Sequence, residues 1–391
     1  MPEMQLLRST YGKTYRFLRA TKGRLIATAK SRAEIKELAG EPAFPEDADF
    51  RILIGPENSA GASFEWARAA SALELPSGKT VAAKSIQVAV AGGFHFSSDI
   101  TIGPHAYAGN LQGWKARVLD SATHVILESG NRITGKFRSG ESAGEIAELQ
   151  ERGIHVALLF HGSDIRQAQL HSETVSDSPL TETGQYWDSI RTRAANNYRL
   201  ACDFTGPIFV STPGLVPHAP NSEWLPLTVD TATYHPDTVP LCRSVPVVTH
   251  APSNPKMKGT TLIEPILEKL DQEGVVEYRR LSGVPHTQMA DFIQETDILV
   301  DQVVLGDYGV LACEAMAAGR LVLASVNVAQ ETMPKLPIVH CTAATLESTI
   351  RQAVADRAAS RERAAQGPDF VAHFHDGTYA GKVLAAKLNL R

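Results

Sequence analysis

Short runs of apolar residues alternate with helical patterns along most of the chain. In the first half these runs occur at 50–55, 86–90, 124–127, 156–160 and 208–212. Runs that are apolar throughout, rather than at every second position, are typical of parallel strands covered by helices on both faces. The first run is followed by a loop of small residues and a helical stretch. That order is the opening unit of a doubly wound domain.

A second series of the same kind follows the proline-rich stretch 213–246, which we interpret as the connection between two domains. It predicts strands at 247–250, 275–281, 298–300 and 321–324, and helices at 259–270, 287–295 and 310–318. Residues 162–188 are polar, and we expect a loop that leads into a helix at 187–201.

A chain of 391 residues is too long for one ordinary hydrophobic core. We therefore predict an α/β protein with two Rossmann-like domains that face each other across a cleft. The expected parts are a basic segment at 1–48, an N-terminal domain at 49–235, a C-terminal domain at 236–370 and a terminal helix at 371–391, which we expect to pack back on the N-terminal domain.

Charge and composition exclude several classes of protein. The net charge of −5 argues against a general nucleic-acid binder, and no apolar run is long enough to span a bilayer. Four cysteines without paired spacing fit a reducing, cytoplasmic location, and the thirteen histidines show no metal-binding spacing, so we expect no obligatory metal or cofactor. Oligomerisation is left open.

The N-terminal segment is strongly basic. Residues 1–40 hold nine Lys or Arg and three Glu, and no acid lies between Met4 and Ala33. One interpretation of residues 4–33 is a solvated basic helix. The other is a peripheral contact with the inner face of a membrane, because aromatic residues such as Tyr15 and Phe17 are interleaved with the basic ones.

The stretch 301–319 carries the strongest chemical signal, because it predicts a strand, a glycine-bearing loop and the start of a helix. Backbone amides at such a turn and helix N-terminus suit phosphate or sugar hydroxyls. Glu314 could accept two hydrogen bonds from a ribose diol. Alternatively, Glu314 only complements the helix dipole at the surface.

The stretch 249–260 places a lysine directly before a helix. Lys258 could meet a diphosphate there as a point charge, and the alternative is a solvated lysine at a helix start. His161 follows a predicted strand, at the edge where open α/β sheets bind ligands, although a lone histidine can also be structural. Asp164 and Arg166 could form a local ion pair that holds this loop.

Two further loops are expected at the same cleft. The loop 55–61, with Asn58 and Gly61, could approach phosphates or the acceptor, or be a plain turn between strand and helix. The loop 282–285, with Gly283, could cradle a nucleobase through backbone contacts.

The motif Glu-Ala-Met-Ala-X-Gly after a tyrosine–glycine turn resembles the donor-site signature of GT-B glycosyltransferases of family 4, including bacterial polysaccharide-type members. The resemblance implies that Glu314 is the second of two paired glutamates and binds ribose. The first would fall at Gly306. Asp307 is therefore expected to contact the donor sugar, together with Tyr308, Gly309 and Val310.

The same resemblance identifies Lys258 as the diphosphate-binding lysine. The arginine that often lies about six residues earlier is replaced by Pro252, Ser253 and Asn254, so Lys256 or a hydroxyl has to compensate. His161, in His-Gly-Ser-Asp-X-Arg, resembles a motif of the N-terminal domain that faces the cleft. These residues give the candidate site, with His161 and Asp307 as the catalytic candidates.

The implied activity is transfer of a sugar from a nucleoside-diphosphate sugar to a glycan, wall-polymer or lipid-linked acceptor, with retention of configuration by analogy. Two alternatives are kept. One is a sugar-nucleotide epimerase of the same fold. The other is a non-catalytic scaffold that binds nucleotide sugars, which the missing glutamate at 306 would explain.

Overall fold

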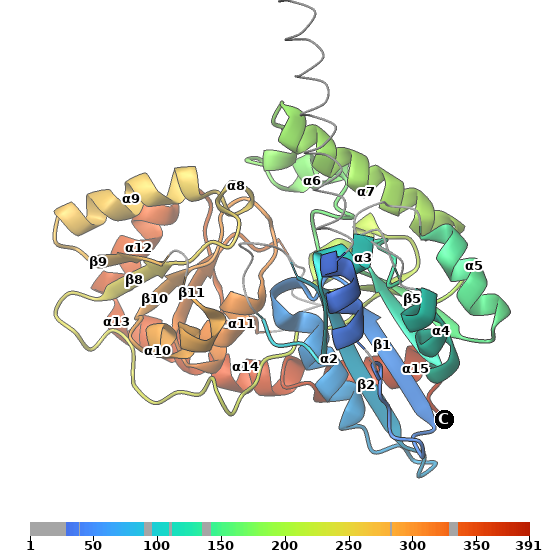
Figure 1. Cartoon of the computed structure of the whole chain (residues 1–391). Coiled ribbons are helices and arrows are strands. Elements are labelled where there is room, and N and C mark those ends of the chain that lie inside the picture. Colours follow the sequence, from blue (N-terminus) through green and yellow to red (C-terminus); the bar gives the residue numbers. More distant parts are fainter. Residues whose placement is uncertain are drawn as a thin grey trace, which may run out of the picture.

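The computed structural model describes residues 29–38, 40–89, 96–108, 112–134, 142–281, 284–327 and 335–391. Within these ranges the chain forms two α/β domains, each built on a parallel sheet (Figure 1). Most of the basic segment 4–33 lies outside the described residues. No helix in the described part of the chain is both long and apolar enough to cross a bilayer.

The N-terminal domain has seven parallel strands in the order β3-β2-β1-β4-β5-β6-β7. The strands are β1 (Phe50–Gly55), β2 (Val81–Val88), β3 (Ile100–Ile102), β4 (His124–Glu128), β5 (His155–Phe160), β6 (Ile208–Val210) and β7 (Ser222–Trp224). The helices are α2 (Ala62–Ser71), α3 (Pro104–Ala108), α4 (Gln112–Ser121), α5 (Ala143–Glu151), α6 (Ala168–Thr174) and α7 (Gln185–Asp203), with 3-10 turns η1 (Ser59–Gly61), η2 (Pro179–Thr181) and η3 (Pro213–His218).

The C-terminal domain has five parallel strands in the order β12-β11-β10-β8-β9. The strands are β8 (Val247–His250), β9 (Glu277–Arg280), β10 (Ile298–Val300), β11 (Leu321–Ala324) and β12 (Val339–His340). The helices are α8 (Pro255–Lys258), α9 (Thr260–Gln272), α10 (Met289–Gln294), α11 (Val310–Ala317), α12 (Leu346–Ala355), α13 (Arg357–Ala365), α14 (Gly367–Phe374) and α15 (Thr378–Lys387), with the 3-10 turn η4 (His286–Gln288).

Strand β1 shows why the apolar runs are continuous. Ile52, Leu53 and Ile54 are all fully buried. Ile52 and Ile54 pack in the cluster that contains Trp66 of α2, while Leu53 packs in the cluster on the opposite face. A strand covered on both faces has no solvent-facing positions, and the predicted pattern follows from that. The predicted α/β fold with two Rossmann-like domains is confirmed.

The proline-rich stretch does not act only as a connection. Its residues 222–224 form β7, which pairs with β6 at the edge of the first sheet. The chain crosses to the second domain after this strand. Residues 162–188, expected as a loop, contain α6 and η2. These elements are short, so the sequence has too few residues to show a helical or strand period.

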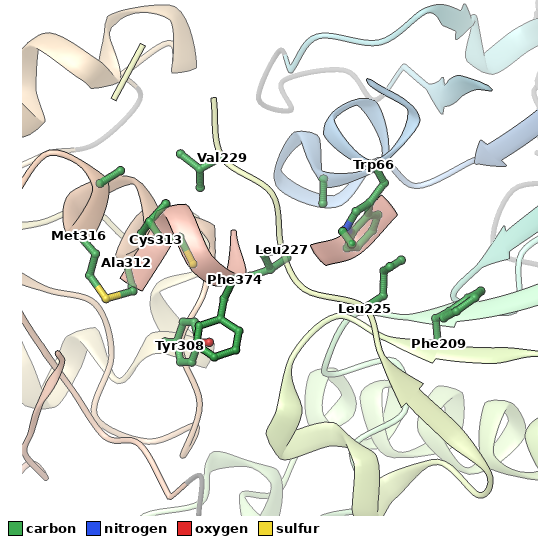
Figure 2. Close-up of a cluster of buried hydrophobic side chains, with 14 of the residues drawn as sticks. Trp66, Phe209, Leu225, Leu227, Val229, Tyr308, Ala312, Cys313, Met316 and Phe374 are labelled. Carbon is green, nitrogen blue, oxygen red and sulfur yellow. The ribbon is translucent and has the colours of Figure 1, made fainter. Parts of the chain in front are cut away.

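One apolar cluster extends across both domains. The segment that carries Leu225, Leu227 and Val229 runs between Trp66 on one side and Met316 on the other (Figure 2). The chain then returns, because α14 packs against α11 of the C-terminal domain and α15 packs against α2 of the N-terminal domain.

Candidate functional site

A cavity of about 280 Å³ lies between the two domains. The N-terminal domain contributes residues that follow β1, β5 and β6, and the C-terminal domain contributes α8, η4, the loop after β10 and the start of α11. The cavity is therefore at the C-terminal edge of both sheets, where open α/β sheets bind ligands. Eight of the predicted site residues line it: His161, Ser253, Lys258, Asp307, Tyr308, Gly309, Val310 and Glu314.

Lys258 lies at a break between two helices. Asn254 caps α8 by accepting a hydrogen bond from the amide of Met257, and Gly259, with φ of 74°, separates α8 from α9. Lys258 Nζ is 2.6 Å from Oδ1 of Asp301, the residue that follows β10. The other Asp301 oxygen accepts a hydrogen bond from the Gly309 amide. The lysine ammonium is thus held against the N-terminus of α11, where an anion is favoured.

Gly309 leaves room for this arrangement. A Cβ atom at position 309 would lie 3.4 Å from Lys258 Nζ, so the backbone and the ammonium are close neighbours. Tyr308 lines the cavity, but its hydroxyl lies 3.2 Å from Nε2 of His375 and its ring is in the core shown in Figure 2. Its contribution to a ligand is therefore mainly through the backbone.

Glu314 is buried in the second turn of α11 and is paired. Its Oε1 atom is 2.8 Å from Nε2 of His286, which also lines the cavity. The hydrogen bond from His286 to Glu314 raises the pKa of His286, with burial opposing the rise. The alternative in which Glu314 only complements the helix dipole at the surface does not hold, because only 4% of the residue is exposed.

Asp307 turns toward the opposite domain. Its Oδ2 atom is 3.8 Å from Nη2 of Arg166 and makes no hydrogen bond among the described residues. Burial raises the pKa of Asp307 to about 6, and the charge of Arg166 opposes the rise. The expected local pair of Arg166 with Asp164 is not formed; the ion pair of Arg166 instead crosses the cleft.

The backbone conformation and the surroundings of position 306 favour glycine over glutamate. Its φ is +69°, and a Cβ atom there would lie 2.9 Å from Val175 of the N-terminal domain. A side chain at 306 would be strained and would collide with the opposite domain. Asp307, the next residue, is a carboxylate that lines the cavity.

His161 is held by the carboxylate of Glu128, which was not among the predicted site residues. Its Nε2 atom is 2.7 Å from Oε1 of Glu128, a fully buried residue at the end of β4. Burial lowers the pKa of His161, but the hydrogen bond and the charge of Glu128 outweigh it and leave the pKa raised.

Four predicted residues do not line the cavity. The Asn58 side chain accepts a hydrogen bond from the Phe64 amide in α2 and donates to the Ser97 carbonyl before β3. Gly61 has a φ of 78° and shapes the start of α2. Asp164 is buried and accepts hydrogen bonds from the amides of His161 and Gly162.

The fourth, Asn254, caps α8 and donates to the hydroxyl of Tyr186 in the N-terminal domain. Asn254 therefore stabilises the helix that carries Lys258 and joins the two domains, and it does not face the cavity. Gly283 lies outside the described residues. No group of three or more His, Cys, Asp or Glu side chains within the described ranges is placed to hold a metal ion.

Three residues of the candidate site were not predicted from the sequence: Glu128, His286 and Asp301. Glu128 and Asp301 directly follow predicted strands, and His286 directly precedes a predicted helix. These positions are the only sign in the sequence that could have pointed to them. Their pairing with His161, Glu314 and Lys258 depends on contacts between elements far apart in sequence.

No protein-family model and no curated protein sequence matches the chain. Solved structures match over most of its length. HepE from Anabaena, in complex with UDP and glucose, is 12% identical, with a TM-score of 0.56, over 88% of this chain and 100% of that chain. Sucrose-phosphate synthase from Thermosynechococcus elongatus is 14% identical, with a TM-score of 0.53, over 87% of this chain and 99% of that chain.

WaaG, a glycosyltransferase involved in lipopolysaccharide biosynthesis, is 11% identical, with a TM-score of 0.52, over 86% of this chain and 99% of that chain. At these identities the likeness concerns the fold. The matched region covers both parallel α/β domains of this chain. The chain therefore has the GT-B fold of these glycosyltransferases.

Proposed function

We propose that this chain is a glycosyltransferase that moves a sugar from a nucleoside-diphosphate sugar to an acceptor hydroxyl. The observation that carries the proposal is the shared cavity. Lys258, the N-terminus of α11 and Glu314 line it from one domain, and His161 and Arg166 line it from the other. The similar HepE structure, which is in complex with UDP and glucose, supports this choice of donor class.

Lys258 and the amides at the start of α11 are the proposed diphosphate site. As the bond from sugar to phosphate breaks, negative charge grows on the leaving diphosphate, and fixed positive groups stabilise that charge in a partly closed cavity. Lys258 would then share its hydrogen bonds between Asp301 and phosphate. The 2.6 Å contact to Asp301 keeps the ammonium in place before the donor binds.

Glu314 is the proposed ribose ligand. One of its oxygens bonds to His286, so the carboxylate is held in a fixed direction at the cavity wall. A carboxylate can accept from two neighbouring hydroxyls, which is the pattern of a ribose diol. His286 would remain its partner and restrict its rotation.

Asp307, Arg166 and His161 form the proposed sugar end of the cavity. Asp307 and Arg166 both line the cavity, so the carboxylate can accept from a sugar hydroxyl and the guanidinium can donate to one. By analogy with family 4 we propose retention of configuration. The proposed acceptor is a glycan, wall polymer or lipid-linked sugar.

A panel of nucleotide sugars, with and without acceptor extracts, tests this function through release of nucleoside diphosphate and the mass of the product. Lys258→Ala is expected to lose binding and turnover. Lys269→Ala is the matched control, because Lys269 lies on α9 of the same domain and pairs with Glu347 at the surface. Binding without turnover under every acceptor would favour the scaffold alternative, and loss of neither in Lys258→Ala would refute the site.

A further inference from the structure

Glu128 joins three strand ends at the cleft edge of the N-terminal domain. Its Oε2 atom accepts the backbone amides of Glu57 and Asn58, both at 2.8 Å, in the loop after β1. Its Oε1 atom accepts from Ser63 Oγ at the start of α2 and from His161 Nε2 after β5. Four donors therefore converge on one fully buried side chain, and their hydrogen bonds fix the direction of its two oxygens.

The His161 ring has little freedom around this contact. It stacks on Trp66 with 21° between the planes and a centroid distance of 5.8 Å. Its backbone amide bonds to Asp164, and its carbonyl accepts from Ser211 Oγ. Since Nε2 is turned to Glu128 and the ring lines the cavity, Nδ1 is the nitrogen available to a substrate. Nδ1 makes no hydrogen bond within the described part of the chain.

The charges around His161 favour its protonated form. Glu128 faces it from β4, Glu57 from the loop after β1 and Asp164 from its own loop. The positive charge of Arg193, on α7, acts on Asp164 and Glu57. Burial opposes ionisation of the ring, yet the pKa of His161 remains above its ordinary value of 6.5. A protonated imidazole has two N–H donors and no acceptor, so in that form His161 donates hydrogen bonds and does not take a proton from an acceptor hydroxyl.

We infer that Glu128 is a positioning residue that orients His161 as a hydrogen-bond donor toward the donor substrate, so that His161 does not act as a general base. This inference rests on the proposed function. Glu128 does not touch the substrate itself, because it is fully buried and does not line the cavity. Its effect on the substrate is proposed to pass through its contact with His161 Nε2.

Histidine NMR gives a test that does not require turnover. The imidazole nitrogens of His161, identified by their loss in His161→Gln, are titrated in wild type, Glu128→Gln, Glu128→Asp and Ser63→Ala. Glu128→Gln is expected to lower the pKa of His161 by about one unit or more, because the facing charge is lost. Ser63→Ala is the matched control, since it removes another donor to the same oxygen and leaves the carboxylate charge.

Activity against pH gives the second readout. If protonated His161 is required, kcat falls as pH rises through the pKa of His161, and this fall occurs at lower pH in Glu128→Gln. The variant should lose kcat by about tenfold or more with a smaller change in KM, since a transition-state donor is weakened. In Glu128→Asp, which retains the charge, the pKa of His161 should stay partly raised. This variant is used instead of Glu128→Gln if the latter does not fold.

Two results would overturn the inference. A His161 titration in Glu128→Gln that matches wild type and Ser63→Ala would show that Glu128 does not control the ring. A kcat that falls as pH decreases through the His161 pKa would identify His161 as a base. If no nucleotide sugar is turned over, the proposed function fails, while the NMR titration still decides whether Glu128 controls His161.

Discussion

Replacing Lys258 by methionine should separate the structural role of this residue from its role in binding. Asp301 is 2% exposed, so removal of the ammonium at 2.6 Å leaves a buried carboxylate without its charged partner. Breaking a buried pair costs about 3–5 kcal/mol. The Gly309 amide still bonds to Asp301, and the Lys258 side chain is 18% exposed, so we expect a cost at the lower end of that range, about 3 kcal/mol.

The nucleotide affinity of Lys258→Met should fall for a different reason. A hydrogen bond from a charged group contributes about 1.5–3 kcal/mol, which corresponds to roughly tenfold to a hundredfold weaker binding. Urea unfolding measures the first effect, and calorimetric titration with UDP, the nucleotide in the HepE complex, measures the second.

The double variant Lys258→Met/Asp301→Asn distinguishes the two effects. Removal of both charges should restore the free energy of unfolding to within about 1 kcal/mol of wild type, because no unpaired charge remains buried. UDP binding should stay weak. The reasoning is wrong if the double variant binds UDP like wild type, or if Lys258→Met unfolds with the same urea midpoint as wild type.

Three further changes test the opposite wall and the ribose end. Burial raises the pKa of Asp307 from 3.8 to about 6, so ionisation of this carboxyl opposes folding. The free energy of unfolding of the wild type, relative to that of Asp307→Asn, should therefore decline by at most about 3 kcal/mol as pH rises from about 4 to 6. A difference in urea midpoint that does not change with pH would contradict this. Gly214→Ala places a Cβ atom 2.6 Å from Asp307 Oδ2 and should reduce turnover more than UDP binding, whereas Gly113→Ala, with open space around its Cβ, should change neither. Glu314→Gln should weaken UDP binding and lower the pKa of His286, and an unchanged His286 titration by NMR would show that their contact is not maintained in solution.

The sequence was sufficient for the main elements of the fold. Strands β1, β8, β10 and β11 have the bounds that their apolar runs predict. The physical reason is that a buried parallel strand needs apolar side chains on both faces, so it appears in the sequence as a continuous apolar run. Edge strands such as β3 and β12 have three residues or fewer, which is too short to form a recognisable apolar run.

The sequence also predicted where several residues of the candidate site lie relative to the strands and helices. His161 and Lys258 follow predicted strands, and Glu314 follows a predicted loop and helix start. Parallel strands place their C-terminal ends at one edge, so these residues could be expected at the cleft from their position along the chain. Their common cavity agrees with that expectation.

The partners of these residues were decided only by the tertiary structure. Glu128 meets His161 across neighbouring strands, His286 meets Glu314 across a turn and a helix, and Arg166 meets Asp307 across two domains. No local pattern encodes these contacts, because they depend on how separate elements pack. The same packing places Val175 beside Gly306 and disfavours a side chain there, so the physical reason for a glycine at this position lies in the opposite domain.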